Sequence, residues 1–289
     1  MIERLFDGRV FLNYGPIQMV LDIYRAGEKV PALAEEVAAE IIEEYLRLIP
    51  MSEIIKKREA ILDESFTGVA RKMVAAVSKI NDEQLTPMAA VAGSFSEYAL
   101  ECAQAAGASK IIINNGGDLA VLSDESEPLY VGVPLYGETN QYVRIRIDSS
   151  SEIQGICTSG LGGRSFTKGV ATAVVVTAPC ASIADAAATH IANQTNFEPV
   201  GKDPITRCYA EEIDFETDIN GQLVTVKADS LTSKEACMAL LNGVKAAEII
   251  HAETYVKGAL LMVQDELAVW PDEMLEVVDF TPMSGAKKI

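Results

Sequence analysis

The feature that most constrains the fold is a turn cluster, Asn114-Asn115-Gly116-Gly117-Asp118, between two short apolar runs. β-branched and apolar residues fill 111–113 and 119–121 without helical spacing, which indicates buried strands. Paired glycines allow backbone torsions that other residues avoid, and they let another group approach the main chain. The stretch predicts a tight hairpin, which either serves as a turn alone or also binds a ligand.

The rest of the chain mixes helical and strand-like patterns. Helices are expected at 32–48, 66–80, from Ser94 or Ser96 to 106, at 179–192 and at 233–251. Strands are expected at 10–12, 18–24, 153–157, 171–177 and 260–263. Hairpins are expected at 128–148, with its turn at 136–140, and around Asn220-Gly221, between 213–219 and 222–227. Hairpin-paired strands mixed with helices indicate an α+β fold, and no repeat or linker divides residues 1–289, so we expect a single domain.

Composition narrows the class of partner. The 289 residues are 49% hydrophobic, enough for a substantial core, and carry a formal net charge of -18. That charge disfavours nucleic acids and anionic membranes as partners, and it means that a phosphate-bearing ligand needs a metal ion or backbone amides. The five cysteines are scattered, and neither a signal-peptide pattern nor a spanning segment is visible, so a cytoplasmic location is expected.

A second glycine-rich stretch, Thr158-Ser159-Gly160-Leu161-Gly162-Gly163-Arg164-Ser165, follows an apolar run. A dinucleotide-binding Rossmann loop would need a third glycine where Ser165 stands, and no phosphate-loop lysine follows. Two interpretations remain open. The stretch is either a surface loop or a source of amides and hydroxyls for a polar ligand.

Asp185 and Thr189 lie four residues apart on an alanine-rich helix and therefore share one face. A carboxylate and a hydroxyl in this arrangement suit a hard cation such as magnesium. Alternatively, the spacing of Ser182 and Asp185 matches a capping box, in which Asp185 would only complete the helix start. The two histidines, His190 and His251, have no triad spacing, and no catalytic residue is assigned.

In chain order, three motifs resemble those of the ApbE superfamily of FAD:protein FMN transferases. They are Asn-Asn-Gly-Gly-Asp at 114–118, Thr-Ser-Gly at 158–160 and Ala-Asp-Ala-Ala-Ala-Thr at 184–189. The resemblance implies an α+β, T-fold-type domain with mixed, largely antiparallel sheets. It also implies magnesium held by Asp185 and Thr189, and FAD bound between the glycine motifs. The flavin site would be lined by Asn115, Gly116, Gly117, Asp118, Thr158, Ser159 and Gly160.

In that family, magnesium polarises the FAD pyrophosphate, a hydroxyl of a target protein attacks the FMN-side phosphorus, and AMP leaves. The chain departs from the family pattern at three places. The family motif Lys-Gly-x-x-x-Asp reads Ala92-Gly93-Ser94-Phe95-Ser96-Glu97, the segment 164–169 lacks the family's histidine, and 196–227 resembles an insertion. The expected function is a magnesium-dependent FMN transferase or FAD-cleaving enzyme. The alternative is a non-catalytic flavin or nucleotide-binding protein that serves a redox pathway or a partner.

A homodimer is also expected. Alanine-rich helices such as 181–192 allow close approach of neighbouring elements, and the strands of the hairpin around Asn220-Gly221 need an edge or surface to cover them.

Overall fold

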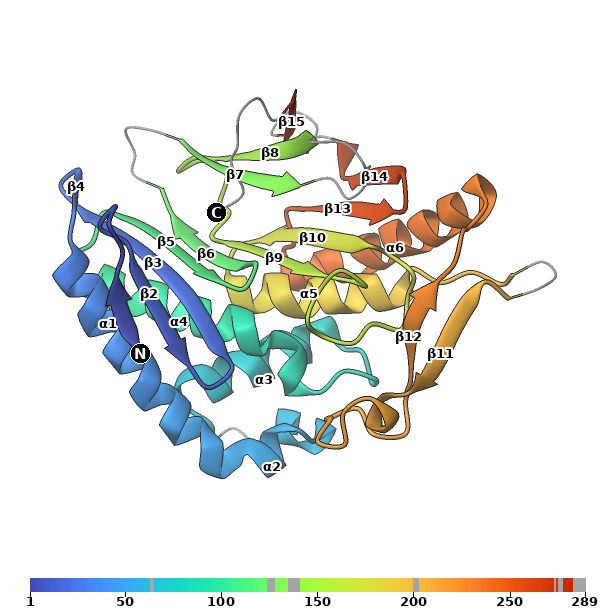
Figure 1. The fold of residues 1–289 in the computed structure, drawn as a ribbon, viewed down its shortest axis with the longest axis horizontal. Coiled ribbons are helices and arrows are strands. Elements are labelled where there is room, and N and C mark those ends of the chain that lie inside the picture. The colour runs from blue at the N-terminus through green and yellow to red at the C-terminus, as the bar shows by residue number, and fades with distance from the viewer. Residues whose placement is uncertain are drawn as a thin grey trace.

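The computed structural model describes residues 1–62, 65–123, 128–134, 141–199, 203–272, 274 and 278–282 (Figure 1). The helices are α1 (Pro31–Leu48), α2 (Ser52–Ile55), α3 (Gly68–Ile80), α4 (Val91–Ala105), α5 (Ala181–Gln194) and α6 (Ser233–Thr254). Short 3-10 helices are η1 (Ile49–Met51), η2 (Arg58–Leu62), η3 (Pro87–Ala90) and η4 (Ala210–Glu212). No helix within these described ranges has the length and apolar character needed to cross a bilayer.

Among the described residues, ten strands form one antiparallel sheet in the order β1-β2-β3-β5-β6-β9-β10-β13-β14, with β4 paired to β3. Their bounds are β1 (Ile2–Arg4), β2 (Val10–Tyr14), β3 (Ile17–Arg25), β4 (Glu28–Lys29), β5 (Lys110–Asn115), β6 (Asp118–Leu122), β9 (Gly155–Ser159), β10 (Ala173–Ala178), β13 (Gly258–Val263) and β14 (Glu266–Trp270). Two smaller sheets are β7 (Leu129–Pro134) with β8 (Gln141–Ile147) and β15 (Val278–Pro282), and β11 (Ile205–Tyr209) with β12 (Leu223–Ala228).

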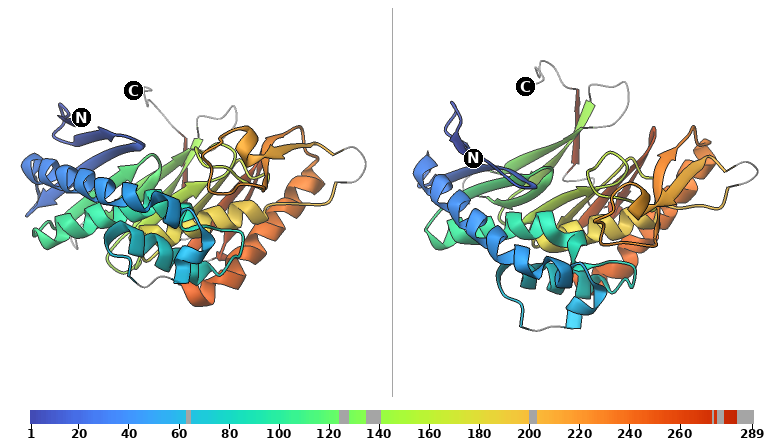
Figure 2. Two further views of the ribbon diagram at one scale, coloured as in Figure 1. Left: turned by 90° about the horizontal axis from the view of Figure 1, so that it is seen from below. Right: turned by 60° about the horizontal axis from the view of Figure 1, so that its bottom comes forward.

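The large sheet is covered on both faces. Helices α1, α4, α5 and α6 pack on one face, with α3 outside them, and the β7-β8-β15 sheet lies over part of the other (Figures 1 and 2). In β10, Val174 and Val176 join the core beneath the helices, while Val175 joins the core beneath the smaller sheet. Burial on both faces explains why β10 and β13 are continuous apolar runs rather than alternating ones. The α+β class with largely antiparallel sheets is confirmed.

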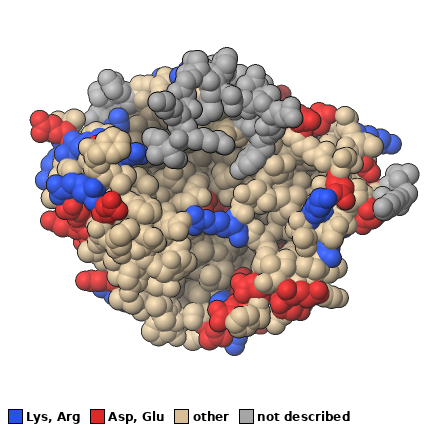
Figure 3. All heavy atoms as spheres, in the orientation of Figure 1, with Lys and Arg blue, Asp and Glu red and all other residues tan. Residues whose placement is uncertain are grey.

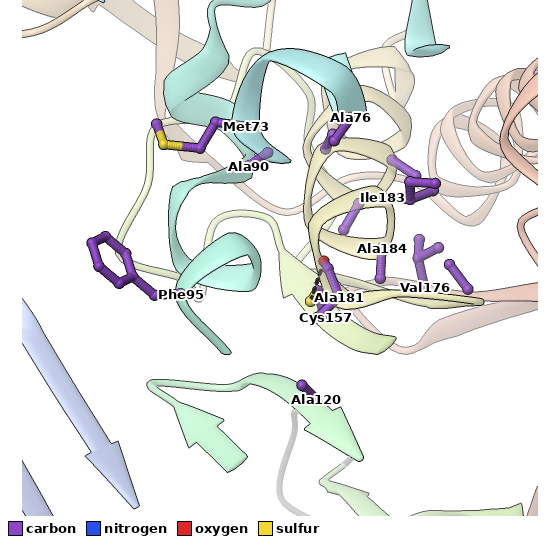
Figure 4. Close-up of a cluster of buried hydrophobic side chains, with 14 of the residues drawn as sticks. Met73, Ala76, Ala90, Phe95, Ala120, Cys157, Val176, Ala181, Ile183 and Ala184 are labelled. Atoms are coloured by element: carbon purple, nitrogen blue, oxygen red, sulfur yellow. Dashed lines mark hydrogen bonds between the residues drawn. The ribbon is translucent and has the colours of Figure 1, made fainter. Parts of the chain in front are cut away.

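The helix core is built from small residues packed closely. Figure 4 shows Ala181 and Ala184 of α5 beside Val176 and Cys157 of the sheet, with the Cys157 thiol bonded to the Ala181 carbonyl oxygen at 3.3 Å. Gly155 lies at the same contact, because a Cβ there would stand 2.3 Å from the Cys180 carbonyl oxygen. The alanines of α5 therefore bring its backbone close to β9.

Two expectations about elements were wrong. The strand expected at 213–219 is absent from this described segment, and β12 pairs instead with β11. Asp214 accepts the Glu216 amide at 3.0 Å, a local side-chain turn that competes with strand pairing. Helix α4 begins at Val91 rather than at Ser94 or Ser96, because it continues directly from η3. The hairpin turn expected at 136–140 lies outside the described residues, although its strands β7 and β8 do pair.

Candidate functional site

The pairing between β6 and β9 is short, which leaves an opening in the large sheet, and two of the predicted motifs, at 114–118 and 158–160, meet there. These strands share two register pairs, Leu119 with Ile156 and Ala120 with Gly155. Beyond them the amide of Thr158 donates not to a strand carbonyl but to Oδ1 of Asp118, at 3.1 Å. The Asp118 side chain thus stands where the next backbone partner of Thr158 would otherwise be.

The turn before Asp118 has the predicted geometry. Gly116 and Gly117 have φ values of 69° and 113°, in the region that favours glycine. Antiparallel pairing of Asn115 with Asp118 closes the hairpin, and the amide of Gly117 donates to the Asn114 side chain at 2.9 Å. A Cβ on Gly117 would meet nothing within 4 Å, so this side of the turn is open.

Arg164 of the second glycine-rich stretch reaches across to this turn. Its Nη1 would lie 3.5 Å from a Cβ on Gly116, and its Nη2 donates to Gln18 Oε1 at 2.6 Å. Burial is the largest cause of the raised pKa of Asp118, which is about 6. Hydrogen bonds from the Thr158 amide and the Cys157 thiol, and the charge of Arg164, act in the opposite direction and lower that pKa. Arg164 is therefore close enough to Asp118 to influence it electrostatically.

Asp185 faces the first turn of α4. The amide of Gly93 donates to its Oδ2 at 2.8 Å, and the amide of Ala92 also hydrogen-bonds the carboxylate. The capping-box interpretation was wrong, because Cys180 is the N-cap of α5 and the helix has no side-chain cap bond. Gly93 is required for this contact, since a Cβ there would lie 2.7 Å from the Asp185 Cβ and 2.2 Å from the Ala181 carbonyl oxygen.

The two aspartates affect each other. Burial, followed by the charge of Asp118, raises the pKa of Asp185 well above its usual range, although the two amides oppose that shift. The same two carboxylates act on Cys157, because burial and then the charges of Asp118 and Asp185 raise the pKa of its thiol. Asp185 is buried and Asp118 is partly buried, so the two carboxylates repel each other when both are ionised, and a bound cation would relieve that repulsion.

Thr189 stands one helical turn beyond Asp185 on α5. Its hydroxyl oxygen lies 3.5 Å from the carbonyl oxygen of Ala89, at the end of η3 just before α4. The segment 89–93 therefore meets both members of the predicted pair, through a carbonyl at one end and an amide at the other. Carboxylate, hydroxyl and carbonyl oxygens are the hard donors that magnesium prefers.

The remaining predicted residues lie around this centre. The buried Asn115 donates from its side chain to the Ala92 carbonyl at 3.3 Å, which ties the turn to α4. Ser159 is 2% exposed, and its hydroxyl has no hydrogen-bond partner among the described residues. Gly160 has φ 126° and packs on the backbone of 171–172. Of these three residues, Ser159 alone presents a buried polar group that is left without a partner.

Sequence reasoning missed Ala89, Cys157, Arg164 and Gln18. A backbone carbonyl has no residue-type signal, and the reach of Arg164 depends on how its loop folds.

His190 bonds through Nδ1 to Asp82 Oδ2 at 2.7 Å, on the side of α5 that faces the loop after α3. Within the described ranges, no group of three or more His, Cys, Asp or Glu side chains is placed to hold a metal ion. In the space-filling view of Figure 3, the molecule is hollowed near the centre of the face shown, and a basic side chain lies at the edge of that hollow.

The chain has relatives of known sequence. A UPF0280 protein of Methanococcoides burtonii is 34% identical over 158 residues, which are 54% of this chain and 64% of that protein. The UPF0280 proteins of Methanosarcina barkeri and Methanococcus aeolicus are 36% and 40% identical over 143 and 134 residues, covering 49% and 45% of this chain and 53% of each relative. The chain thus spans between about half and two thirds of the length of these curated relatives.

Solved structures similar to this one include the apo form of the flavinyl transferase ApbE of Pseudomonas stutzeri, with a TM-score of 0.47 and 11% identity over 93% of both chains. The flavin transferase ApbE of Vibrio cholerae has a TM-score of 0.43 and 10% identity over 93% of this chain and 97% of that chain. A family model described as AbpE bacteria matches residues 2–269. Since that match spans most of the 289 residues, the chain belongs to the AbpE bacteria family and is an ApbE-like protein.

Proposed function

We propose that this protein binds FAD together with Mg²⁺ at the opening between β6 and β9 and cleaves the FAD pyrophosphate, with FMN passing to an acceptor hydroxyl. The observation that carries the proposal is that one segment, 89–93, contacts both Asp185 and Thr189, while the charge of Asp118 acts on Asp185. Repelling buried carboxylates beside neutral oxygen donors are typical of a cation site rather than of a packed core.

The donor set is suited to magnesium. Asp185 and Thr189 would hold the ion, with the Ala89 carbonyl as a further oxygen. A carboxylate has about four acceptor positions, so the amides of Ala92 and Gly93 leave positions free for a cation. Magnesium at such a site uses few protein ligands and keeps positions for phosphate oxygens, and it would supply the polarisation of the pyrophosphate.

The groups around the ion would position the nucleotide. The open Gly116–Gly117 turn permits close approach of a ligand to the main chain, and Arg164 adds a cation beside that turn. The Ser159 hydroxyl is a buried polar group in need of a partner. On a chain of net charge -18, such local donors are what allows an anionic nucleotide to bind. In the proposed transfer, the acceptor oxygen bonds to the FMN phosphorus, the bond from that phosphorus to the bridging oxygen breaks, and AMP leaves.

A second function follows from the departures from the family pattern. Ala92 stands where the family has its lysine, and the segment 164–169 contains no histidine. These losses favour a protein that binds a flavin or nucleotide without turning it over and serves a redox pathway or a partner. Either role is proposed for the cytoplasm, where the five cysteines, all free, would stay reduced.

One experiment separates the two functions. Purified protein is incubated with FAD and MgCl2, AMP and FMN are quantified by chromatography, and FAD binding is measured in parallel by flavin fluorescence. The enzyme proposal predicts AMP release that Asp185→Asn and Thr189→Val abolish and that Asp265→Asn, a substitution of an exposed aspartate, leaves intact. Binding without release would support the second function, and the absence of any flavin binding would contradict both.

A further inference from the structure

A cavity of about 420 Å³ lies between α3, α4 and the start of α5, and its lining includes none of the residues of the candidate flavin and metal site. The alanines at 75 and 76 leave room on the α3 side, and Tyr98 of α4 and Ile183 of α5 add apolar surface. This volume falls within the range of small-molecule sites, which span roughly 300–1,000 Å³. The cavity is therefore large enough for a small metabolite.

Three cations of α3 line this cavity. Arg71 and Lys79 are exposed, and neither side chain makes a hydrogen bond or ion pair within the described part of the chain. Lys72 contacts Glu97 at 2.8 Å and Glu101 at 2.6 Å. An ammonium group has three donors, so Lys72 keeps one for a further acceptor.

The charge balance at the cavity is opposite to that of the chain. Three cations face two carboxylates, and Glu97 is further engaged because it accepts the Ser182 amide at 3.0 Å. The chain as a whole carries 42 acidic and 24 basic residues. The first turn of α5, including Ser182, also lies at the cavity and adds the partial positive charge of a helix N-terminus. The cavity is thus a locally positive pocket on a strongly negative protein.

We propose that this cavity is a second ligand site, which binds a small phosphorylated metabolite. Arg71 and the free donor of Lys72 would hold the phosphoryl group, since a guanidinium binds phosphate oxygens in a bidentate manner. Tyr98 and the two alanines would contact the rest of the molecule. Lys79 lies eight residues, about 12 Å, along α3 from Arg71 and therefore faces the opposite end of the ligand.

The test is calorimetric titration of the full chain with inorganic phosphate at constant ionic strength. Wild-type protein is expected to bind phosphate, Arg71→Gln to weaken that binding at least tenfold, and Lys79→Gln to weaken it less. Lys245→Gln, which changes an exposed lysine of α6, should bind as wild type does. Thermal unfolding of each variant verifies that these surface substitutions leave the fold intact.

Arg164→Gln distinguishes this cavity from the candidate flavin site, which also has reason to bind phosphate. If the cavity is the site, Arg164→Gln retains phosphate binding and Arg71→Gln loses it. The proposal is overturned if wild-type protein shows no phosphate binding or if Arg71→Gln binds phosphate as tightly as wild type. It is also overturned if Arg164→Gln, rather than Arg71→Gln, loses phosphate binding.

Discussion

The carboxylates of Asp185 and Glu97 each accept a hydrogen bond from the first turn of the helix that carries the other. Asp185 of α5 accepts the Gly93 amide of α4 at 2.8 Å, and Glu97 of α4 accepts the Ser182 amide of α5 at 3.0 Å. Both helix starts have amides without intrahelical partners, and neither helix has a side-chain cap of its own. This reciprocal capping joins the two helices in an antiparallel pair.

Loss of Glu97 should therefore destabilise the protein. Burial opposes the ionisation of Glu97, but its bonds to Lys72 and to Ser182 hold its pKa below the usual value. Glu97→Ala would leave a buried amide and a half-buried ammonium without this acceptor, at a cost of about 1–3 kcal/mol. Urea unfolding measures the difference, with Glu53→Ala, at an 83% exposed side chain, as the matched control. Equal stability of the two variants would contradict the capping role.

Asp118 should make the fold less stable as the pH rises. Its pKa is about 6 in the folded protein against the ordinary 3.8, so between these values the folded state binds more protons than the unfolded state does. Stability from this group is present below about pH 4 and is lost by about pH 6, a change of up to about 3 kcal/mol. Asp118→Asn, which keeps an oxygen for the Thr158 amide, should raise the melting temperature at pH 7.5 and have little effect at pH 4. A rise of the same size at both pH values would show that the charge is not the cause.

Gly93 should tolerate no side chain. An added Cβ would stand 2.2 Å from the Ala181 carbonyl oxygen, and relief of that clash requires α4 and α5 to separate. Gly93→Ala is expected to cost about 1–3 kcal/mol or more through overpacking. Gly132→Ala is the control, because its Cβ would meet the Tyr142 ring at an ordinary 3.4 Å. Thermal unfolding measures the melting temperature of both variants. An equal melting temperature for Gly93→Ala and Gly132→Ala would contradict the prediction.

Arg164 should discriminate between ligands by their phosphates, if the proposed flavin site is correct. Arg164→Ala is expected to weaken FAD binding about tenfold and to change riboflavin binding little, because riboflavin has no phosphate for the guanidinium. Gln18→Ala removes only the partner of Arg164 and should have a smaller effect. Fluorescence titrations with both ligands provide the comparison, and an equal loss for both would indicate that Arg164 supports the loop instead.

The homodimer remains a prediction. Tyr209, Leu223 and Val226 of the β11–β12 hairpin are each about half exposed, so the hairpin offers apolar surface for an interface. Light scattering should give twice the chain mass of 31.1 kDa. Val226→Lys should shift that mass to the monomer, whereas Ile249→Lys on α6 should not. A wild-type monomer at micromolar concentration would refute the prediction.

Sequence patterns predicted the buried strands β10 and β13 well. Both are short apolar runs, too short for a typical helix, and β10 is rich in β-branched valines. They failed at 213–219, where short polar side chains bond to the local backbone and outweigh the strand propensity. At the site, the i,i+4 spacing correctly places Asp185 and Thr189 on one side of α5. The role of the Ala89 carbonyl could not be predicted from the sequence. Every residue has a backbone carbonyl, and only the folded structure shows which one lies beside Thr189.

The narrow contact between β6 and β9 has a mechanical consequence. With two register pairs at this junction, the large sheet consists of an N-terminal half, β1 to β6, and a C-terminal half, β9 to β14. Each half carries part of the candidate site, with Asp118 at the edge of one and Thr158 at the edge of the other. The helix pair α4 and α5 spans the same junction from below. Because the two edges that carry Asp118 and Thr158 are joined over so short a stretch, the spacing of the site depends on how closely α4 and α5 pack.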